Sequence, residues 1–244
     1  MNLIIDIGNT CIKLVAFDGG KVVDERRSDK NDVASLKDFC NRYPFADGIF
    51  SAVSDISDEY RTALQSLSFR MLELRSGVTR VPIKNMYATP ETLGTDRLAA
   101  AVGANMLQPG HDLLIIDIGT CVTFDFVNSK GEYLGGNISP GPSMRLRALN
   151  DYTARLPLVS RKGDTPDVGN DTETAIRSGV INGVKYEIEG YIRFFLAKYP
   201  QLFVYLTGGV HLNLEFSKNL PIFADDFIVP KGLNRILEYN NEHK

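Results

Sequence analysis

Several residue types are scarce in this chain of 244 residues. It has no tryptophan and only three histidines, which lie too far apart in sequence to suggest a cluster of metal ligands. The three cysteines, Cys11, Cys40 and Cys121, are odd in number and lack the CxxC spacing of thiolate metal sites. These features argue against a disulfide framework and a cysteine-bound metal, and we expect reduced thiols.

Strong charge of one sign and long apolar runs are also missing. The 27 basic and 30 acidic residues give a net charge of −3 without a dense basic run, which argues against nucleic acid and anionic membranes as partners. No stretch is long enough to span a bilayer, and the opening MNLIIDIGNT lacks the features of a signal peptide. We therefore expect a cytoplasmic globular protein, whose 43% hydrophobic residues can fill one large core or two small ones.

The familiar phosphate-binding motifs are absent, but a repeat is present. The chain has no GxxxxGK[ST] motif, no GxGxxG after its first strand and no HRD/DFG pair of protein kinases. Instead, LIIDIGNTC at residues 3–11 returns as LIIDIGTC at residues 114–121. Because the separation is close to half the chain, it indicates a duplicated domain. We predict two domains, residues 1–111 and 112–244.

Each copy of the repeat predicts a buried strand, a turn and a second strand. In the second copy the apolar run ends at Asp117, and Gly119 and Thr120 form the turn. Such a turn lets backbone N–H groups approach an anion, although ordinary β-turns have the same composition. Two hairpins facing each other across a cleft would bring Asp6, Asp117 and both turns to one ligand. We predict a phosphate site there.

Periodicity and capping patterns predict the remaining elements. We expect helices over residues 32–43, 57–67, 94–108, 143–149, 170–199, 211–219 and 230–238. We expect strands over residues 48–53, 70–74, 202–207 and 224–229, a Gly/Pro-rich loop over 133–142 and a frayed tail over 240–244. Gly179, Gly183 and Gly190 interrupt the longest helix at a cost of about 1 kcal/mol each. Close packing of another helix, such as the same helix of a second subunit, would explain them.

Four residues at turns and helix starts provide what phosphoryl transfer needs. Asp6 could hold Mg²⁺ through water, Lys13 could reach a phosphate, and Asp117 could bind a cation. Asp96 could accept the proton of a substrate hydroxyl. A carboxylate in the first turn of a helix is equally explained by the helix dipole, so residue type alone leaves both roles open for Asp96.

The motifs taken together resemble type III pantothenate kinase. They are DIGNT at residues 6–10, Tyr87 followed by LGTDR at 93–97, DIGT at 117–120, GGNISPG at 135–141, the helix start at Thr172 and TGG at 207–209. They occur in order, while residues 17–81 add no motif. Cys11 and Cys121 follow the two turns, where we expect varied small or polar residues, and Val210 follows TGG. These departures affect fine nucleotide contacts rather than the reaction.

The resemblance implies a fold, a reaction and partners. The family belongs to the acetate and sugar kinase, Hsp70 and actin superfamily, with an α/β fold of two duplicated ribonuclease H-like domains and ATP in the cleft between them. It phosphorylates pantothenate with ATP to 4′-phosphopantothenate, the first step of coenzyme A biosynthesis. The family functions as a homodimer and requires Mg²⁺ and a monovalent cation, K⁺ or NH₄⁺.

The resemblance also assigns residues. It places the proton acceptor on Asp96, the monovalent cation on Asp117 and pantothenate contacts on Tyr87, Gly94, Thr95, Asp96, Arg97 and Thr172. Nucleotide contacts fall on Asp6, Ile7, Gly8, Asn9, Thr10, Cys11, Ile12, Lys13 and Thr120. Two alternatives stay open: a regulator that binds ATP without transfer, and a sugar or acid kinase of the same superfamily.

Overall fold

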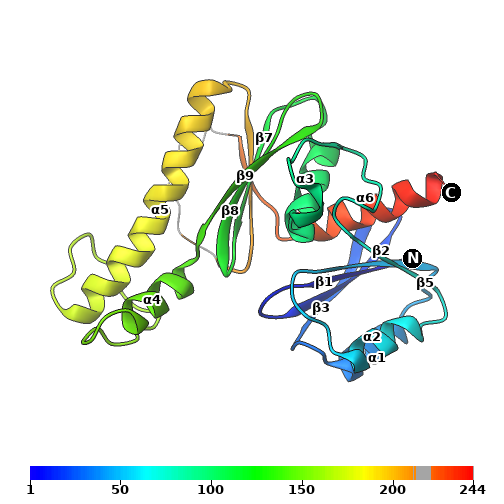
Figure 1. Ribbon diagram of the computed structural model, residues 1–244, viewed down its shortest axis with the longest axis horizontal. Coiled ribbons are helices and arrows are strands. Elements are labelled where there is room, and N and C mark those ends of the chain that lie inside the picture. The colour runs from blue at the N-terminus through cyan, green and yellow to red at the C-terminus, as the bar shows by residue number, and fades with distance from the viewer. Residues whose placement is uncertain (211, 213–220, 244) are drawn as a thin grey trace. The chain divides into compact units, whose positions relative to one another are not determined.

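The computed structural model describes residues 1–210, 212 and 221–243 as an α/β protein with two mixed sheets. The chain divides into two compact units (Figure 1). Unit 1 comprises Met1–His111, Val127–Gly135 and Phe227–Lys244, and unit 2 comprises Asp112–Phe126 and Gly136–Asp226. The chain thus passes between the units more than once. The assignment of residues 1–111 and 112–244 to two domains stays a prediction.

Unit 1 is built on a five-stranded sheet with the order β3-β2-β1-β4-β5. Its strands are β1 (Asn2–Ile7), β2 (Ile12–Asp18), β3 (Lys21–Ser28), β4 (Asp47–Ala52) and β5 (Arg70–Glu73). β1, β2 and β3 form an antiparallel meander, and β4 runs parallel to β1. The predicted meander is confirmed.

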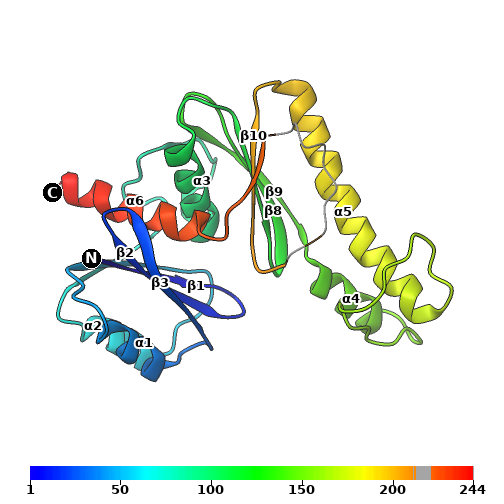
Figure 2. The same cartoon turned by 180° about the vertical axis from the view of Figure 1, so that it is seen from behind.

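The two faces of β1 have different partners because successive side chains of a strand point to opposite faces. Leu3, Ile5 and Ile7 join the core beside α1 (Val33–Cys40) and α2 (Asp58–Gln65), with Leu36, Phe39, Tyr60 and Leu64. The opposite face meets α6 (Ile228–Glu242), where Asn2 donates to Asn234 at 2.9 Å. Figures 1 and 2 show α1 and α2 on one side of this sheet and α6 on the other. Asp6 alternates with Ile5 and Ile7, and therefore lies on the face of α6.

Helix α3 (Thr95–Leu107) packs against α6 at exceptionally short range. A Cβ added to Gly232 would lie 1.8 Å from the carbonyl oxygen of Ala99, and one on Gly103 would lie 2.2 Å from that of Ile228. Only glycine allows the two backbones to touch in this way. The crossing therefore fixes α3, whose first turn carries Asp96.

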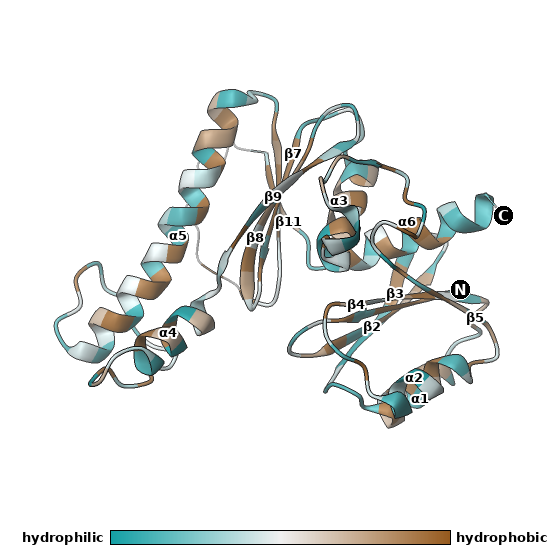
Figure 3. Cartoon of the chain, in the orientation of Figure 1, coloured by the Kyte–Doolittle hydropathy of each residue, from teal (hydrophilic) through white to brown (hydrophobic). Residues whose placement is uncertain are grey.

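The second sheet has six strands in the order β11-β10-β7-β8-β9-β6. They are β6 (Lys84–Asn85), β7 (Leu113–Ile118), β8 (Cys121–Val127), β9 (Glu132–Pro140), β10 (Phe203–Thr207) and β11 (Ile222–Ala224). Within unit 2, α5 (Thr172–Lys198) buries Val184, Ile188 and Ile192 against the apolar residues of β7 and β8. Figure 3 shows these strands as largely hydrophobic. The remaining helices are α4 (Pro142–Asp151) and the short 3-10 helix η1 (Pro90–Thr92).

The duplication seen in sequence is present in three dimensions. β2-β1-β4-β5 and β8-β7-β10-β11 have the same strand order, and in each copy the third strand of this order runs parallel to the second. The backbone hydrogen bonds at the two corners also correspond. Within the turn, Gly8 N donates to Cys11 O at 3.1 Å, and Gly119 N donates to Cys121 O at 2.9 Å. After the parallel strand, Val53 N donates to Ile7 O at 3.1 Å, and Val210 N donates to Ile118 O at 3.0 Å. The predicted pair of ribonuclease H-like halves is confirmed.

Three predicted elements are wrong. Residues 132–140 form strand β9 rather than a loop, because sheet pairing overrides their Gly/Pro-rich composition. Residues 224–229 are not a strand, since β11 ends at Ala224 and α6 begins at Ile228. Residues 240–242 do not fray: Asn240 donates to Arg80 O at 2.8 Å and Asn241 to Asp47 at 3.1 Å. Apart from residue 212, the predicted helix 211–219 lies outside the described residues.

Two helices begin slightly later than predicted. Helix α3 begins at Thr95, after its N-cap Gly94. Helix α5 begins at Thr172, after Asp171, which caps it in a capping box with Thr174. Among the described residues, none of the helices combines the length and apolar character required to cross a membrane.

Candidate active site

The first part of the site is the edge of the unit 1 sheet where β1 and β4 end. Asp6 is half-buried on β1 and lies opposite Ser51 on β4 and Lys13 on β2. Ser51 is fully buried, and its Oγ donates to Asp6 Oδ1 at 3.0 Å. Sequence analysis missed Ser51. A hydroxyl residue directly after the apolar pair Ile49-Phe50 of β4 was the available sign.

The turn between β1 and β2 is the predicted nucleotide loop. Asn9 and Thr10 are exposed, and Ser54 Oγ donates to the carbonyl oxygen of Gly8 at 3.1 Å. Ile7 and Ile12 are buried in the core. Their predicted contact with a nucleotide is therefore restricted to backbone atoms.

The start of α3 belongs to the same electrostatic environment as Asp6. The pKa of Asp6 is raised to about 6, mainly by burial and then by the negative charge of Asp96, while the Ser51 hydroxyl and the Lys13 ammonium lower it. The two carboxylates are thus close enough to interact. Thr95 Oγ1 also donates to the carbonyl oxygen of Ala52 at 3.5 Å, which connects this helix start to the end of β4.

Local geometry holds the Asp96 side chain at the N-terminus of α3. Its Oδ1 accepts from the backbone N–H of Arg97 at 2.8 Å. A Cβ on Gly94 would lie 2.6 Å from the same oxygen, so Gly94 leaves the space that this carboxylate occupies. A carboxylate at this position interacts favourably with the positive end of the helix dipole.

Arg97 and Tyr87 form the adjoining wall. Arg97 is only 7% exposed, and its Cζ lies 6.0 Å from the centroid of the Tyr87 ring, within cation–π range. Tyr87 in turn lies 6.2 Å from the ring of Tyr133, and Gly135 adopts φ +116° beside it. The structure therefore brings together Tyr87 and the predicted substrate residues at 94–97. Their role as pantothenate ligands stays a prediction.

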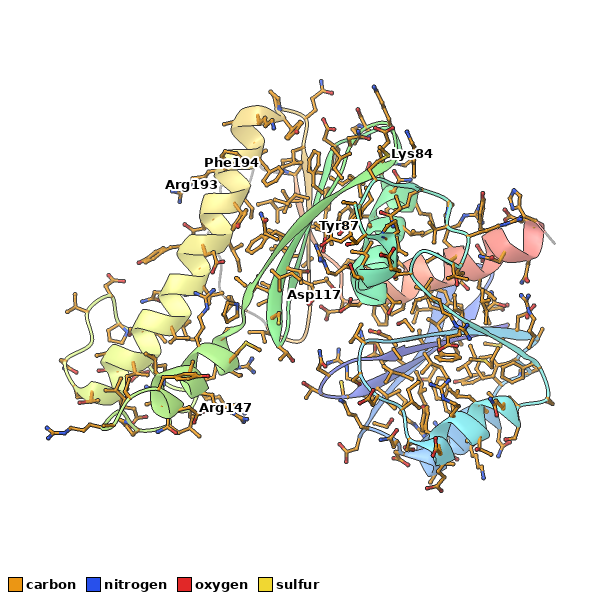
Figure 4. All side chains as sticks on the ribbon, in the orientation of Figure 1. Lys84, Tyr87, Asp117, Arg147, Arg193 and Phe194 are labelled. Carbon is orange, nitrogen blue, oxygen red and sulfur yellow. The ribbon has the colours of Figure 1, made fainter. Side chains whose placement is uncertain are left out.

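The second copy of the repeat forms a corresponding corner in unit 2. Asp117 is half-buried near the end of β7 (Figure 4) and lies opposite Thr207 on β10. Gly208 has φ +106°, and a Cβ there would lie 2.6 Å from Asp117 Oδ1 and 2.5 Å from the carbonyl oxygen of Ile118. Only glycine fits this approach of backbone to carboxylate. Thr120 is exposed in the adjacent turn.

Thr172 belongs to a different unit from the other predicted substrate residues. It is the first residue of α5, it is exposed, and it lies in unit 2. Tyr87 and residues 94–97 belong to unit 1. A shared substrate site that includes Thr172 stays a prediction.

Residues 2–194 match the family model described as type III pantothenate kinase. The type III pantothenate kinase of Phocaeicola vulgatus is 52% identical over 242 residues, which cover 99% of this chain and 100% of the relative. That of Bacteroides fragilis is 50% identical over 241 residues, which cover 99% of each chain. These similarities extend over both copies of the repeat.

Solved structures with little sequence identity share the fold. A Baf family transcriptional activator from Campylobacter jejuni has a TM-score of 0.61 at 19% identity, covering 98% of this chain and 99% of its own. An inorganic polyphosphate/ATP-glucomannokinase from Arthrobacter has a TM-score of 0.50 at 11% identity, covering 100% of both chains. At this identity the likeness concerns the fold alone.

The raised pKa of Asp6 predicts how the ligand-free protein responds to pH. A carboxyl group with an elevated folded-state pKa favours folding when protonated, and that contribution disappears as pH rises through about 6. Asp6→Asn should therefore be more stable than the wild type at pH 8, by about 1–2 kcal/mol, with the difference shrinking towards pH 4. Urea unfolding across this range, without nucleotide or Mg²⁺, measures it.

Asp32→Asn is the matched control, because it should show the opposite trend. Asp32 caps α1, and the backbone N–H of Ser35 lowers the pKa of its carboxyl. The wild type should gain stability over this variant as pH rises. A difference between Asp6→Asn and wild type that does not change with pH would contradict the raised pKa of Asp6.

Proposed function

Because the chain belongs to the type III pantothenate kinase family, it is a pantothenate kinase of coenzyme A biosynthesis that uses ATP, and we propose that Asp96 accepts the proton of the substrate hydroxyl. One observation supports this assignment above others. The charge of Asp96, at the start of α3, raises the pKa of Asp6, beside the nucleotide loop. The group that would receive the proton therefore lies near the residues that would face the phosphates.

The proposed step is a direct phosphoryl transfer. The oxygen of the primary hydroxyl of pantothenate bonds to the γ-phosphorus of ATP, the bond from that phosphorus to the bridging oxygen breaks, and ADP leaves. The hydroxyl proton passes to the Asp96 carboxylate. Such a reaction depends mainly on positioning and on cations that offset the charge of the phosphates. Lys13 supplies one positive charge beside Asp6, and Arg97 can pair with the carboxylate of pantothenate.

Mg²⁺ fits the residues of the nucleotide corner. Among the described residues no group of three or more His, Cys, Asp or Glu side chains could hold a metal ion. Mg²⁺ commonly retains several waters and uses one or two carboxylates together with substrate phosphates. The Asp6 carboxylate would contact hydrated Mg²⁺, which when bound offsets the charge of the phosphates.

A monovalent cation fits the corner around Asp117. The carboxylate lies beside backbone that Gly208 allows to approach closely, so that Asp117 Oδ1 and the carbonyl oxygen of Ile118 are near one another. Oxygen donors of this kind suit K⁺, whose hydration shell carbonyl oxygens can replace. Asp117 would hold K⁺ or NH₄⁺, and the Thr120 hydroxyl would contact the nucleotide.

Two other functions of the same fold remain distinguishable by experiment. A regulator that binds ATP without transferring phosphate has no use for a substrate base, so the arrangement around Asp96 favours an enzyme. Purified protein with Mg-ATP and K⁺ should convert pantothenate to 4′-phosphopantothenate. Failure with pantothenate but phosphorylation of another small alcohol would indicate a sugar or acid kinase. We expect this reaction to take place in the cytoplasm.

Replacing the proposed base tests its role directly. Asp96→Asn should preserve folding but lower kcat by about 100-fold or more, since the amide cannot accept the proton. Steady-state kinetics and thermal melting measure the two effects. Asp58→Asn, in the first turn of α2, is the control for loss of a carboxylate from a helix start. Near-normal turnover of Asp96→Asn would refute the role.

Asp117 should govern the response to the monovalent cation. Asp117→Ala removes a charged oxygen ligand without adding atoms near Gly208, and should raise the K⁺ concentration for half-maximal activity by about tenfold or more. A K⁺ titration of activity measures this. Asp151→Ala, at the exposed end of α4 in the same unit, should leave the titration unchanged. An unaltered curve for Asp117→Ala would remove the assignment.

We also expect a homodimer, and α5 provides the argument. A Cβ on Gly179, Gly183 or Gly190 would meet nothing within 4 Å of the described chain. Tyr186 and Phe194 are exposed on the same helix, and Phe194 is labelled in Figure 4. These glycines weaken the helix without an internal packing reason. Light scattering should give about twice the chain mass of 27.1 kDa. Gly183→Ala should shift the protein towards monomer, and a wild type that is only monomeric would contradict the dimer.

A further inference from the structure

A buried hydroxyl group donates a hydrogen bond to the Asp6 carboxylate. β1 and β4 are parallel neighbours whose register sets Asp6 opposite Ser51. Paired residues of neighbouring strands project from the same face of a sheet, so the short serine side chain reaches Asp6 directly. Its Oγ donates to Oδ1 at 3.0 Å and is fully buried. The bond uses one carboxylate oxygen and thereby fixes the direction of the other.

The same end of β4 is bonded to both halves of the unit 1 site. Val53 N donates to Ile7 O at 3.1 Å, and Ser54 Oγ donates to Gly8 O at 3.1 Å. On its other side, Ala52 O accepts from Thr95 Oγ1, next to Asp96. Residues 51–54 therefore connect the nucleotide loop to the helix start that carries the base.

We propose that Ser51 is a positioning residue that orients the Asp6 carboxylate towards the Mg²⁺-bound phosphates and keeps it from moving relative to Asp96. Asp6 and Asp96 are both acids, and repulsion between like charges would otherwise push the Asp6 carboxylate away from Asp96. A buried donor with a fixed hydrogen bond opposes that movement. The inference rests on the proposed function, because it gives Asp6 a role in holding Mg-ATP.

The second copy of the repeat provides independent support. Thr207 lies opposite Asp117 in the same parallel register, and it is also buried, at 7% exposure. A small hydroxyl residue is thus buried beside the acid in both copies. A serine needed only to fill space could be replaced by alanine. The repeated hydroxyl points instead to a common requirement for a donor next to the carboxylate.

Three substitutions of Ser51 separate orientation from packing. Ser51→Ala removes the donor and should lower kcat about tenfold and raise the Mg²⁺ concentration for half-maximal activity several-fold, with the KM for pantothenate changed less than about twofold. Ser51→Thr keeps the hydroxyl and should recover most of both losses, as the buried Thr207 suggests. Ser51→Cys introduces a weaker donor of similar size, so its kcat and Mg²⁺ dependence should lie between those of Ser51→Ala and the wild type. If Ser51→Ala does not fold, Ser51→Cys takes its place in the test.

Calorimetric titration with Mg-ATP in the absence of pantothenate provides a readout that does not depend on turnover. Ser51→Ala should bind about tenfold more weakly, while the control Ser66→Ala, which loses only a bond to Ala63 O in α2, should bind as the wild type does. Unchanged Mg-ATP binding and Mg²⁺ dependence in Ser51→Ala would overturn the proposal. So would equal losses in every parameter without recovery by Ser51→Thr. If wild type binds Mg-ATP but leaves pantothenate unphosphorylated, the proposed function fails, whereas the titration still decides the role of Ser51.

Discussion

The site depends on keeping two carboxylates of like charge near each other on a partly buried surface. Burial and the charge of Asp96 both make ionisation of Asp6 less favourable, while the Ser51 hydroxyl and Lys13 favour it. Such an arrangement is costly in the absence of ligand. A phosphate-bound cation would relieve it, because positive charge at this position stabilises both carboxylates. Under the proposed function, this electrostatic cost would contribute to selectivity for a metal-bound nucleotide.

Rigid packing maintains that arrangement. The sheet register sets Asp6 opposite Ser51 and Lys13, and the glycine contact between α3 and α6 fixes the helix that carries Asp96. Neither carboxylate is carried by a long loop. Two like charges on flexible segments would move apart. The Asp6 and Asp96 carboxylates stay close because β1 and α3 are held by rigid packing.

The two copies of the repeat place one type of backbone corner in two different chemical surroundings. Both turns close with a bond from a glycine N–H to a cysteine carbonyl oxygen, and both acids lie opposite a buried hydroxyl residue. The surroundings differ: Lys13 lies opposite Asp6 on β2, whereas Gly208 brings backbone close to Asp117. A corner beside an ammonium group suits anionic phosphates, and one lined by backbone oxygens suits a cation.

Sequence alone determined the features that depend on local chemistry. The duplicated LIIDIG segment predicted two matching strand corners, and the Ala-rich run after Gly94 predicted α3, because periodicity and turn composition act over a few residues. The motif set also identified the family. The role of Ser51, the N-cap at Gly94 and strand β9 were beyond its reach. Each depends on which residues become neighbours through sheet register and helix crossing. The sequence does not reveal these contacts, because the residues that form them are far apart along the chain.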